Sequence, residues 1–342
     1  MGVFAKALAW LGFGPVGHGQ HDHDQDRAHG HTHGVVDPTI ATTTRGIWAI
    51  KWSFLILAAT AVLQLVVVFV SNSVALLADT IHNIADAGTA IPLWVAFVLA
   101  RRKPTQTFTY GYGRVEDFAG LAIVLIILLS ALVAGYEAID RLIHPHPVVQ
   151  LGWLAAAGVI GFLGNEAVAV FRIRVGRQIN SAALIADGYH ARTDGLTSLA
   201  VVLGAFGVWM GYTLADPIIG LIITVVILGI VWQSAKAVLT RMLDGVDLST
   251  IDELRHAAQH AKGVLSVESV RARWLGHRLY AEMTLAVDPT LSLADARKIA
   301  EDVRGHARGH LPALASLHVE LVPASSPQRS EPRPESEYQH HH

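Results

Sequence analysis

Six apolar stretches, each about 20 residues long or longer, fill the middle of this chain and constrain its fold more than any other feature. A helix needs about 20 predominantly apolar residues to cross the hydrocarbon core of a bilayer. The qualifying stretches are residues 52–70, 74–100, 115–139, 151–171, 182–212 and 217–234. We therefore expect an α-helical polytopic membrane protein with six transmembrane helices.

The composition narrows the class of protein further. Hydrophobic residues make up 52% of the chain and charged residues only 16%, which is too apolar for an ordinary soluble enzyme. There is no cysteine, so any metal ion must be held by imidazole and carboxylate groups. The formal net charge of -2 gives no reason to expect a nucleic-acid partner.

Positive charge flanks the apolar stretches on one side. The residues on that side are Arg45, Lys51, Arg101, Arg102, Lys103, Arg114, Arg172, Arg174, Arg177, Lys236 and Arg241. The other side has only Arg141. Cytoplasmic loops carry an excess of Lys and Arg, so we expect a multi-pass protein of the cell membrane with both termini in the cytoplasm.

The two ends of the chain are polar. We expect residues 1–45 to be a disordered, His-rich cytoplasmic segment and residues 324–342 to be a disordered tail, because neither has enough apolar surface to fold. Short His-rich tracts chelate metal loosely, which would raise the local metal concentration; the alternative is a solvated tail without a role. The spaced histidines of the first segment are His18, His21, His23, His29, His31 and His33.

Between these ends the pattern changes from a transmembrane domain, residues 46–243, to a small soluble domain, residues 244–323. The second part predicts a helix over 249–262, strands over 264–275 and 277–287, a helix over 292–310 and a strand over 316–322. This α-β-β-α-β order predicts one sheet covered by two helices.

The second and fifth apolar stretches contain two related strings. NSVALLADTIHNIAD occupies residues 72–86, and NSAALIADGYHARTD occupies residues 180–194. The strings align without a gap, which indicates an internal duplication. Because the two stretches cross the membrane in opposite directions, we expect an inverted repeat of the kind found in many transporters.

Each string carries a histidine and an aspartate four residues apart, His82 with Asp86 and His190 with Asp194. Residues at this spacing share one face of a helix, so two facing helices offer two nitrogen and two oxygen ligands, a set suited to tetrahedral Zn²⁺. The alternative is that these groups only satisfy one another in helix packing. Ionisable groups at mid-membrane cost about 2.5 to 3.5 kcal/mol each on insertion scales, which favours a functional role.

Asp79 and Asp187 precede the two histidines by one helical turn. They could orient the second ring nitrogen of each histidine or accept protons, with direct binding of the metal as a further alternative. Glu166 in the fourth stretch and Arg192 in the fifth also lie at membrane depth, where they could pair with each other, or Glu166 could belong to a proton path.

The strings HNIAD and HARTD, in their topological positions, resemble the cation diffusion facilitator family, and the likeness extends over residues 52–322. The resemblance implies a homodimer in the lipid bilayer that exports cytoplasmic Zn²⁺, or a similar divalent ion, in exchange for protons. It places His82, Asp86, His190 and Asp194 at the transport site.

The membrane domain departs from this family at one loop. Tyr112 stands where many relatives have a histidine, so we do not expect a metal site there. Arg114 resembles a basic residue that pairs with an aspartate after the sixth stretch, for which Asp244 is the candidate. Such a pair could hold the membrane domains of the dimer together.

In the soluble domain, His318 and Glu320 match the final pair of regulatory metal ligands in the family. Glu268 and Arg297 stand at other ligand positions, so a bridging metal cluster looks incomplete. We expect dimerisation and packing to be the main role of this domain, with metal binding left open.

Other functions fit the sequence less well. An intramembrane metallohydrolase could use the same four ligands, but the chain lacks HExxH and four protein ligands leave no position for water. No phosphate-binding loop or organic cofactor is expected, so we do not expect an enzyme. A membrane metal sensor or storage protein remains open, as does export of Cd²⁺, Co²⁺, Fe²⁺ or Ni²⁺.

Overall fold

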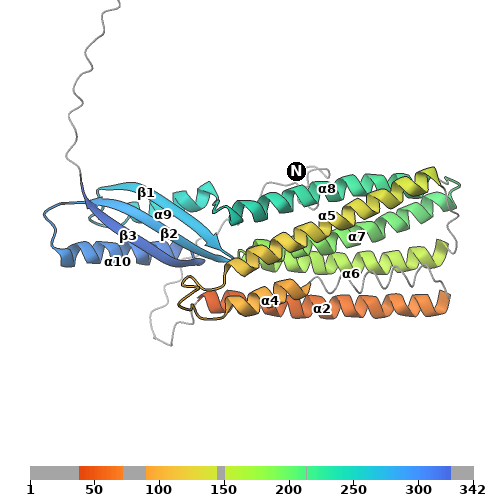
Figure 1. Ribbon diagram of the computed structural model, residues 1–342, viewed down its shortest axis with the longest axis horizontal. Coiled ribbons are helices and arrows are strands. Elements are labelled where there is room, and N and C mark those ends of the chain that lie inside the picture. The colour runs from red at the N-terminus through yellow and green to blue at the C-terminus, as the bar shows by residue number, and fades with distance from the viewer. Residues whose placement is uncertain (1–37, 72–89, 145–150, 213, 325–342) are drawn as a thin grey trace, which may run out of the picture. The chain divides into compact units, whose positions relative to one another are not determined.

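The computed structural model describes residues 38–71, 90–144, 151–212 and 214–324. They form two compact units (Figure 1). The first comprises the described residues up to Val246 together with Arg273–Leu279, and the second comprises Asp247–Ala272 and the described residues from Tyr280 onward. The first unit is helical apart from the adjoining ends of two strands, and the second contains helices and the rest of the sheet.

Four helices of the first unit are long and apolar enough to cross a membrane. They are α2 (Pro38–Ser71), α5 (Arg114–Ile143), α6 (Leu151–Gln178) and α8 (Ala215–Met242). Their positions match the expected first, third, fourth and sixth spans. The membrane class predicted from the apolar stretches is therefore confirmed for these four segments.

The other two expected spans are different cases. Helix α7 (Ala182–Trp209) forms where the fifth span was predicted, but its charged residues keep it outside the group of four apolar helices. Helix α4 (Ala90–Ala100) is the end of the predicted second span, whose remaining residues, 74–89, lie outside the described part of the chain. The number of six spans therefore stays a prediction, because part of the second span lies outside the described residues.

Helix α2 begins at Pro38, so the prediction of disorder up to residue 45 is wrong for its last part. The physical reason is packing against His277, whose Nε2 lies 3.0 Å from Oγ1 of Thr43, and against α4. Thr43 is fully buried, and a Cβ atom on Gly46 would lie 2.8 Å from the ring of Phe97. These contacts extend the helix beyond the apolar stretch that the sequence marks.

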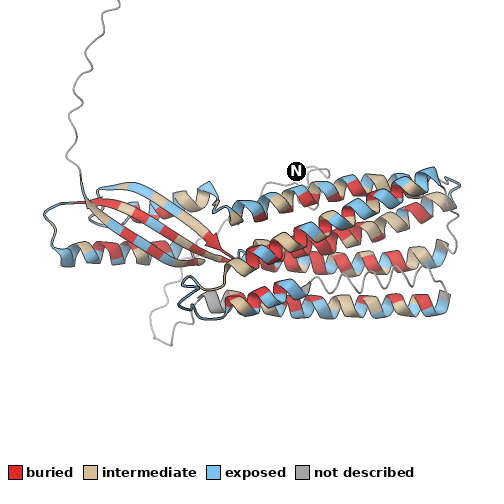
Figure 2. Cartoon of the chain, in the orientation of Figure 1, coloured by how far each residue is buried: buried red, intermediate tan, exposed pale blue. Residues whose placement is uncertain are grey.

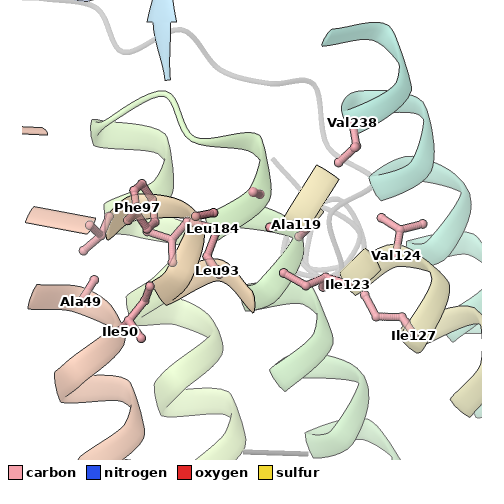
Figure 3. Close-up of a cluster of buried hydrophobic side chains, with 14 of the residues drawn as sticks. Ala49, Ile50, Leu93, Phe97, Ala119, Ile123, Val124, Ile127, Leu184 and Val238 are labelled. Carbon is pink, nitrogen blue, oxygen red and sulfur yellow. The ribbon is translucent and has the colours of Figure 1, made fainter. Parts of the chain in front are cut away.

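The core of the first unit lies where α2, α4, α5, α7 and α8 meet. Figure 3 shows its side chains, among them Phe97, Leu93, Ile123 and Leu184, which are all fully buried. The outer faces of the helices also carry large apolar side chains, such as Phe69 at 81% exposure (Figure 2). Apolar side chains on both the inner and the outer faces are expected of helices surrounded by lipid.

The second unit is built on a three-stranded sheet in the order β1-β2-β3. Its elements are α9 (Leu248–Gln259), β1 (Ser266–Leu275), β2 (Arg278–Val287), α10 (Leu293–His310) and β3 (Leu314–Pro323). The predicted α-β-β-α-β order is confirmed. Along β3, Leu317 and Val319 are buried whereas His318 and Glu320 are exposed, as expected of a sheet covered on one face.

Candidate metal site

The site begins at the N-terminus of α7, which two local features define. Asn180 has a φ of 56°, a left-handed conformation that asparagine tolerates and that separates α6 from α7. Ser181 then caps α7, because its Oγ accepts a hydrogen bond from the backbone N–H of Leu184 at 3.1 Å. This start sets the rotation of the helix that presents His190 and Asp194.

His190 and Asp194 lie on one face of α7, as their spacing predicts. The Nδ1 atom of His190 is 3.6 Å from Oδ1 of Asp194, and the histidine side chain is almost completely buried. Thr197 and Ser198 direct their hydroxyls to the backbone carbonyl of Asp194 rather than to its carboxylate. An imidazole nitrogen and a carboxylate oxygen, the two candidate ligand types, therefore lie side by side.

Neither ring nitrogen of His190 has a hydrogen-bond partner among the described residues. A buried polar group left without a partner costs about 1 to 3 kcal/mol, so such groups are rare unless another ligand completes them. Among the described residues, nothing therefore occupies the ring nitrogens of His190, and a ligand such as a metal ion could bind them.

The partner half of the predicted site, His82 and Asp86, lies outside the described residues, as does Asp79. Within the described ranges, no group of three or more His, Asp or Glu side chains is arranged to hold a metal ion. His190 and Asp194 are thus half of the predicted ligand set, and the other half remains a prediction from the repeat.

Asp187 does not orient His190, contrary to one of the two roles considered for it. Its carboxylate Oδ2 lies 3.0 Å from Nη1 of Arg172 on α6, and both side chains are buried. Arg172 was interpreted from the sequence as one of the cationic residues flanking the spans. The only signal in the sequence for the pairing of Asp187 with Arg172 was the free-energy cost of an aspartate at membrane depth, which calls for a partner.

Glu166 and Arg192 are paired, which confirms the first alternative suggested for them. The Nη2 and Nε atoms of Arg192 donate to the two carboxylate oxygens of Glu166 at 2.7 and 3.1 Å. A two-pronged arginine–carboxylate contact fixes geometry as well as charge. Helices α6 and α7 are therefore joined by two ion pairs, one on each side of His190 in the sequence.

Close backbone packing accompanies these pairs. A Cβ atom on Gly164 would lie 2.1 Å from Oγ1 of Thr60, and one on Gly161 would lie 2.8 Å from Oγ of Ser198. Glycine at both positions therefore permits close helix packing.

Sequence reasoning missed a buried polar cluster around Glu116 in the first turn of α5. The Glu116 carboxylate accepts a hydrogen bond from Ser181 Oγ at 2.5 Å and lies 2.7 Å from Nδ1 of His277. The other ring nitrogen of His277 is 3.0 Å from Oγ1 of Thr43. The same serine that caps α7 is therefore held in place by Glu116.

The turn that carries His277 requires glycine. Gly276 has a φ of 61°, and a Cβ atom at this position would lie 2.6 Å from Oε2 of Glu116. Both the left-handed backbone and the close approach exclude a larger residue. No sequence motif marks this contact, because its members come from distant parts of the chain.

Arg114 and Asp244 form the predicted ion pair. Nη2 of Arg114 is 2.5 Å from Oδ1 of Asp244, and its Nη1 donates to the backbone carbonyl of Met242 at 3.1 Å. The side chains are 37% and 46% exposed. Tyr112 packs its ring against Phe108, with centroids 4.9 Å apart.

In the second unit, Glu320 and the two residues at the other ligand positions make ordinary polar contacts. Glu320 accepts a hydrogen bond from Thr284 Oγ1 at 3.1 Å, and Glu268 accepts one from Ser266 Oγ at 2.5 Å. Arg297 is paired with Glu301 on the surface of α10. Metal binding by His318 and Glu320 therefore stays an open prediction, beside the expected role of this unit in dimerisation and packing.

Comparison with known proteins covers most of the chain. Residues 50–243 match the family described as "Cation efflux transmembrane domain", and residues 246–322 match "Cation efflux protein, cytoplasmic domain". A probable cation efflux system protein of Mycobacterium tuberculosis is 52% identical over 297 residues, which cover 86% of this chain and 90% of that protein.

More distant relatives are named for particular metals or organelles. The manganese efflux system protein MneS of Bacillus subtilis is 22% identical and matches 79% of this chain and 92% of its own length. Among solved structures, a MamM-CTD fragment is 30% identical, with a TM-score of 0.22, and covers 22% of this chain and 98% of that chain.

Proposed function

The chain belongs to the cation efflux family, and on this premise we propose that it exports Zn²⁺ across the membrane in exchange for protons. The family is one of divalent-metal transporters. The proposed transport site consists of His190 and Asp194 on α7 together with His82 and Asp86 of the matching string.

The state of His190 is the observation that carries this proposal. Its imidazole is buried, stands next to the Asp194 carboxylate and has no hydrogen-bond partner among the described residues. In a helix that only packs against its neighbours, a buried imidazole would be satisfied by another protein group. A metal ion that arrives and leaves explains why both ring nitrogens are kept available.

The neighbouring charges support the same assignment. Arg172 is paired with Asp187, and Arg192 is paired with Glu166, so each of these two acids already has an arginine partner. An acid whose charge is already neutralised by arginine is a poor metal ligand and a poor proton carrier. The exchange of metal and protons is therefore assigned to the His–Asp pairs.

Competition between metal and protons supplies the antiport mechanism. Imidazole and carboxylate bind metal only when they are deprotonated, so metal binding releases protons and protonation releases metal. An acidic compartment on the far side of the membrane then promotes release there. No further chemical step is needed for coupled exchange.

The proposed metal follows from the donor atoms. Two imidazole nitrogens and two carboxylate oxygens suit Zn²⁺, whereas Mn²⁺ favours sites richer in oxygen. A relative named for manganese efflux, at 22% identity, does not outweigh this donor set. Competition of unlabelled Cd²⁺, Co²⁺, Fe²⁺, Ni²⁺ and Mn²⁺ against Zn²⁺ flux will rank the ions directly.

The test is zinc uptake by vesicles that contain the purified protein and have an acidic lumen. We expect His190→Asn and Asp194→Asn to abolish uptake while the protein stays folded. A matched control is available at the end of α5, where Asp140 and His144 form an exposed pair at the same four-residue spacing, 3.3 Å apart. Asp140→Asn and His144→Asn should retain uptake.

Two results would contradict the proposal. If Asp194→Asn left zinc uptake unchanged, the assignment of the transport site to α7 would be wrong. Zinc binding without uptake in the unaltered protein would instead favour a sensor or storage role.

We also propose that the second unit holds two copies of the chain together. Support comes from its match to the cytoplasmic domain of cation efflux proteins and from its exposed apolar side chains, which include Leu248 and Leu293. The mass of the detergent-solubilised protein, measured by light scattering, should be that of a dimer, and Leu293→Glu should shift it toward the monomer.

A further inference from the structure

Three histidines gather at the ends of the two helices of the second unit. His256 lies in the last turn of α9, His260 caps the C-terminus of that helix, and His310 is the last residue of α10. All three side chains are exposed. None of them belongs to the paired strings or to the ligand positions considered for this unit above.

The imidazoles of His256 and His260 touch through the same atom of each ring. Their Nε2 atoms are 3.0 Å apart, and their ring centroids are 4.2 Å apart with the planes nearly perpendicular. The ring of His310 follows at 6.2 Å, centroid to centroid, from that of His256. The two Nε2 atoms therefore lie close enough to bind one partner together, with a third imidazole nearby.

We propose that His256 and His260 chelate a divalent cation of the imidazole-preferring class, Zn²⁺, Ni²⁺ or Cu²⁺, and that His310 completes the site. With metal–nitrogen bonds of about 2.0 to 2.1 Å, two nitrogens 3.0 Å apart subtend an angle of about 90° at the metal. This is the angle between neighbouring ligands in a tetragonal site and is within reach of a distorted tetrahedral one.

The third ligand requires one side-chain adjustment. Among the described residues, no three His, Asp or Glu side chains are placed to hold one metal ion. His310 must therefore rotate its ring toward His256 and His260 to become the third ligand. Rotation of an exposed histidine about its side-chain torsions is fast and inexpensive. Water can fill the remaining positions of such an open site.

The electrostatic setting favours a cation. The C-terminal turn of a helix carries a partial negative charge on its unpaired carbonyls, and both α9 and α10 end at this place. Arg255 on α9 is neutralised by Asp252, at 3.5 Å. Lys262, two residues after His260, and Arg308, two residues before His310, carry opposing charges, so we expect moderate affinity rather than that of a closed structural site.

A metal bound here would join the ends of α9 and α10. These helices pack against each other, α10 also packs against β3, and their buried faces include Leu254 and Val303. A ligand that binds the folded unit alone stabilises it by mass action. The cytoplasmic unit would thus become more stable when metal is abundant, by a route separate from the transport site.

The experiment uses the full-length protein in detergent and Zn²⁺ alone as the probe. Diethyl pyrocarbonate modifies unprotonated imidazoles, and mass spectrometry of the digested protein gives the rate at each histidine. At about ten times the dissociation constant, Zn²⁺ should slow modification of His256 and His260 about tenfold, because only about a tenth of the sites stay empty. Mg²⁺ should have no effect.

His306 serves as a control on the same helix as His310. It is exposed, and its Nδ1 lies 2.8 Å from the backbone carbonyl of Asp302, so Zn²⁺ should leave its modification rate unchanged. His256→Ala, a change at an exposed position, should remove the protection of His260. Cu²⁺ electron paramagnetic resonance should show the loss of one nitrogen-coordinated signal in the same variant.

Two outcomes would overturn the proposal: modification rates of His256 and His260 that do not respond to Zn²⁺, or protection of His260 that persists in His256→Ala. This result is independent of the proposed export. Asp194→Asn should abolish uptake without changing the protection of His260, and failure of uptake in the unaltered protein would leave the site on α9 and α10 intact.

Discussion

Arg172 on α6 and Asp187 on α7 form an ion pair whose two side chains are 2% and 0% exposed, with Nη1 and Oδ2 separated by 3.0 Å. The aspartate lies one helical turn before His190. The pair therefore keeps a carboxylate charge out of reach of the candidate metal ligand and fixes α6 against α7 next to it.

Removing either partner of this pair should destabilise the protein strongly, because a buried charge would be left alone. We expect Arg172→Met and Asp187→Leu each to cost about 3 to 5 kcal/mol, and the double variant to cost clearly less than their sum. Thermal unfolding in detergent measures all three. Arg141→Met, at the more exposed pair of Arg141 with Asp216, should cost much less; additive losses at the buried pair would refute the coupling.

Glu166 and Arg192 should act as a structural pair and not as a proton carrier. Glu166→Gln removes the negative charge paired with Arg192 and should lower the unfolding temperature, whereas Glu166→Gln combined with Arg192→Gln should recover part of the loss. The ratio of proton flux to zinc flux, followed with two dyes, should be unchanged in the double variant. A fall in proton flux with intact zinc binding would instead assign Glu166 to the proton path.

Ser181→Ala should destabilise the protein more than an ordinary loss of a helix cap, about 1 kcal/mol. It removes the cap of α7 and also one donor to the buried Glu116 carboxylate. The comparison is Ser292→Ala, which removes the cap of α10 and a donor to the Asp295 carboxylate, both at an exposed position. Equal losses in the two variants, measured by thermal unfolding, would show that burial of the contact with Glu116 adds nothing.

Asp244 combines an ion pair with an unusual backbone. Its φ is 61°, a left-handed conformation that costs alanine about 1 to 2 kcal/mol and costs glycine little. The exposed pair with Arg114 contributes only about 0 to 1 kcal/mol. Asp244→Gly should therefore be more stable to heat than Asp244→Ala, although both lose the ion pair; the reverse order would show that the pair dominates.

The second unit should lose stability in acid through Asp295. Hydrogen bonds from Ser292 and Lys298 lower the pKa of this carboxyl below its ordinary value of 3.8. A lowered pKa in the folded state means that the contribution is present above the ordinary value and is lost as the pH falls through the folded value. Circular dichroism on acid titration should show Asp295→Asn less sensitive than the unaltered protein below about pH 4.

The sequence determined the elements with good accuracy where one physical signal dominates. Apolar length predicted α2, α5, α6 and α8, and the change of periodicity after Asp244 predicted the α-β-β-α-β unit. Both signals are local, since a span depends on its own length and a strand or helix on its own repeat. The same local reasoning placed His190 and Asp194 on one face of α7.

What the sequence left open depends on contacts between distant segments. The pairing of Glu166 with Arg192 was one of two alternatives, and the pairing of Asp187 with Arg172 was not foreseen. Nor was the cluster of Glu116 with Ser181 and His277, residues 65 and 161 positions away from it. A sequence states that a buried charge needs a partner, but only the packing of helices brings a particular partner within reach, because many arginines and acids satisfy the same rule.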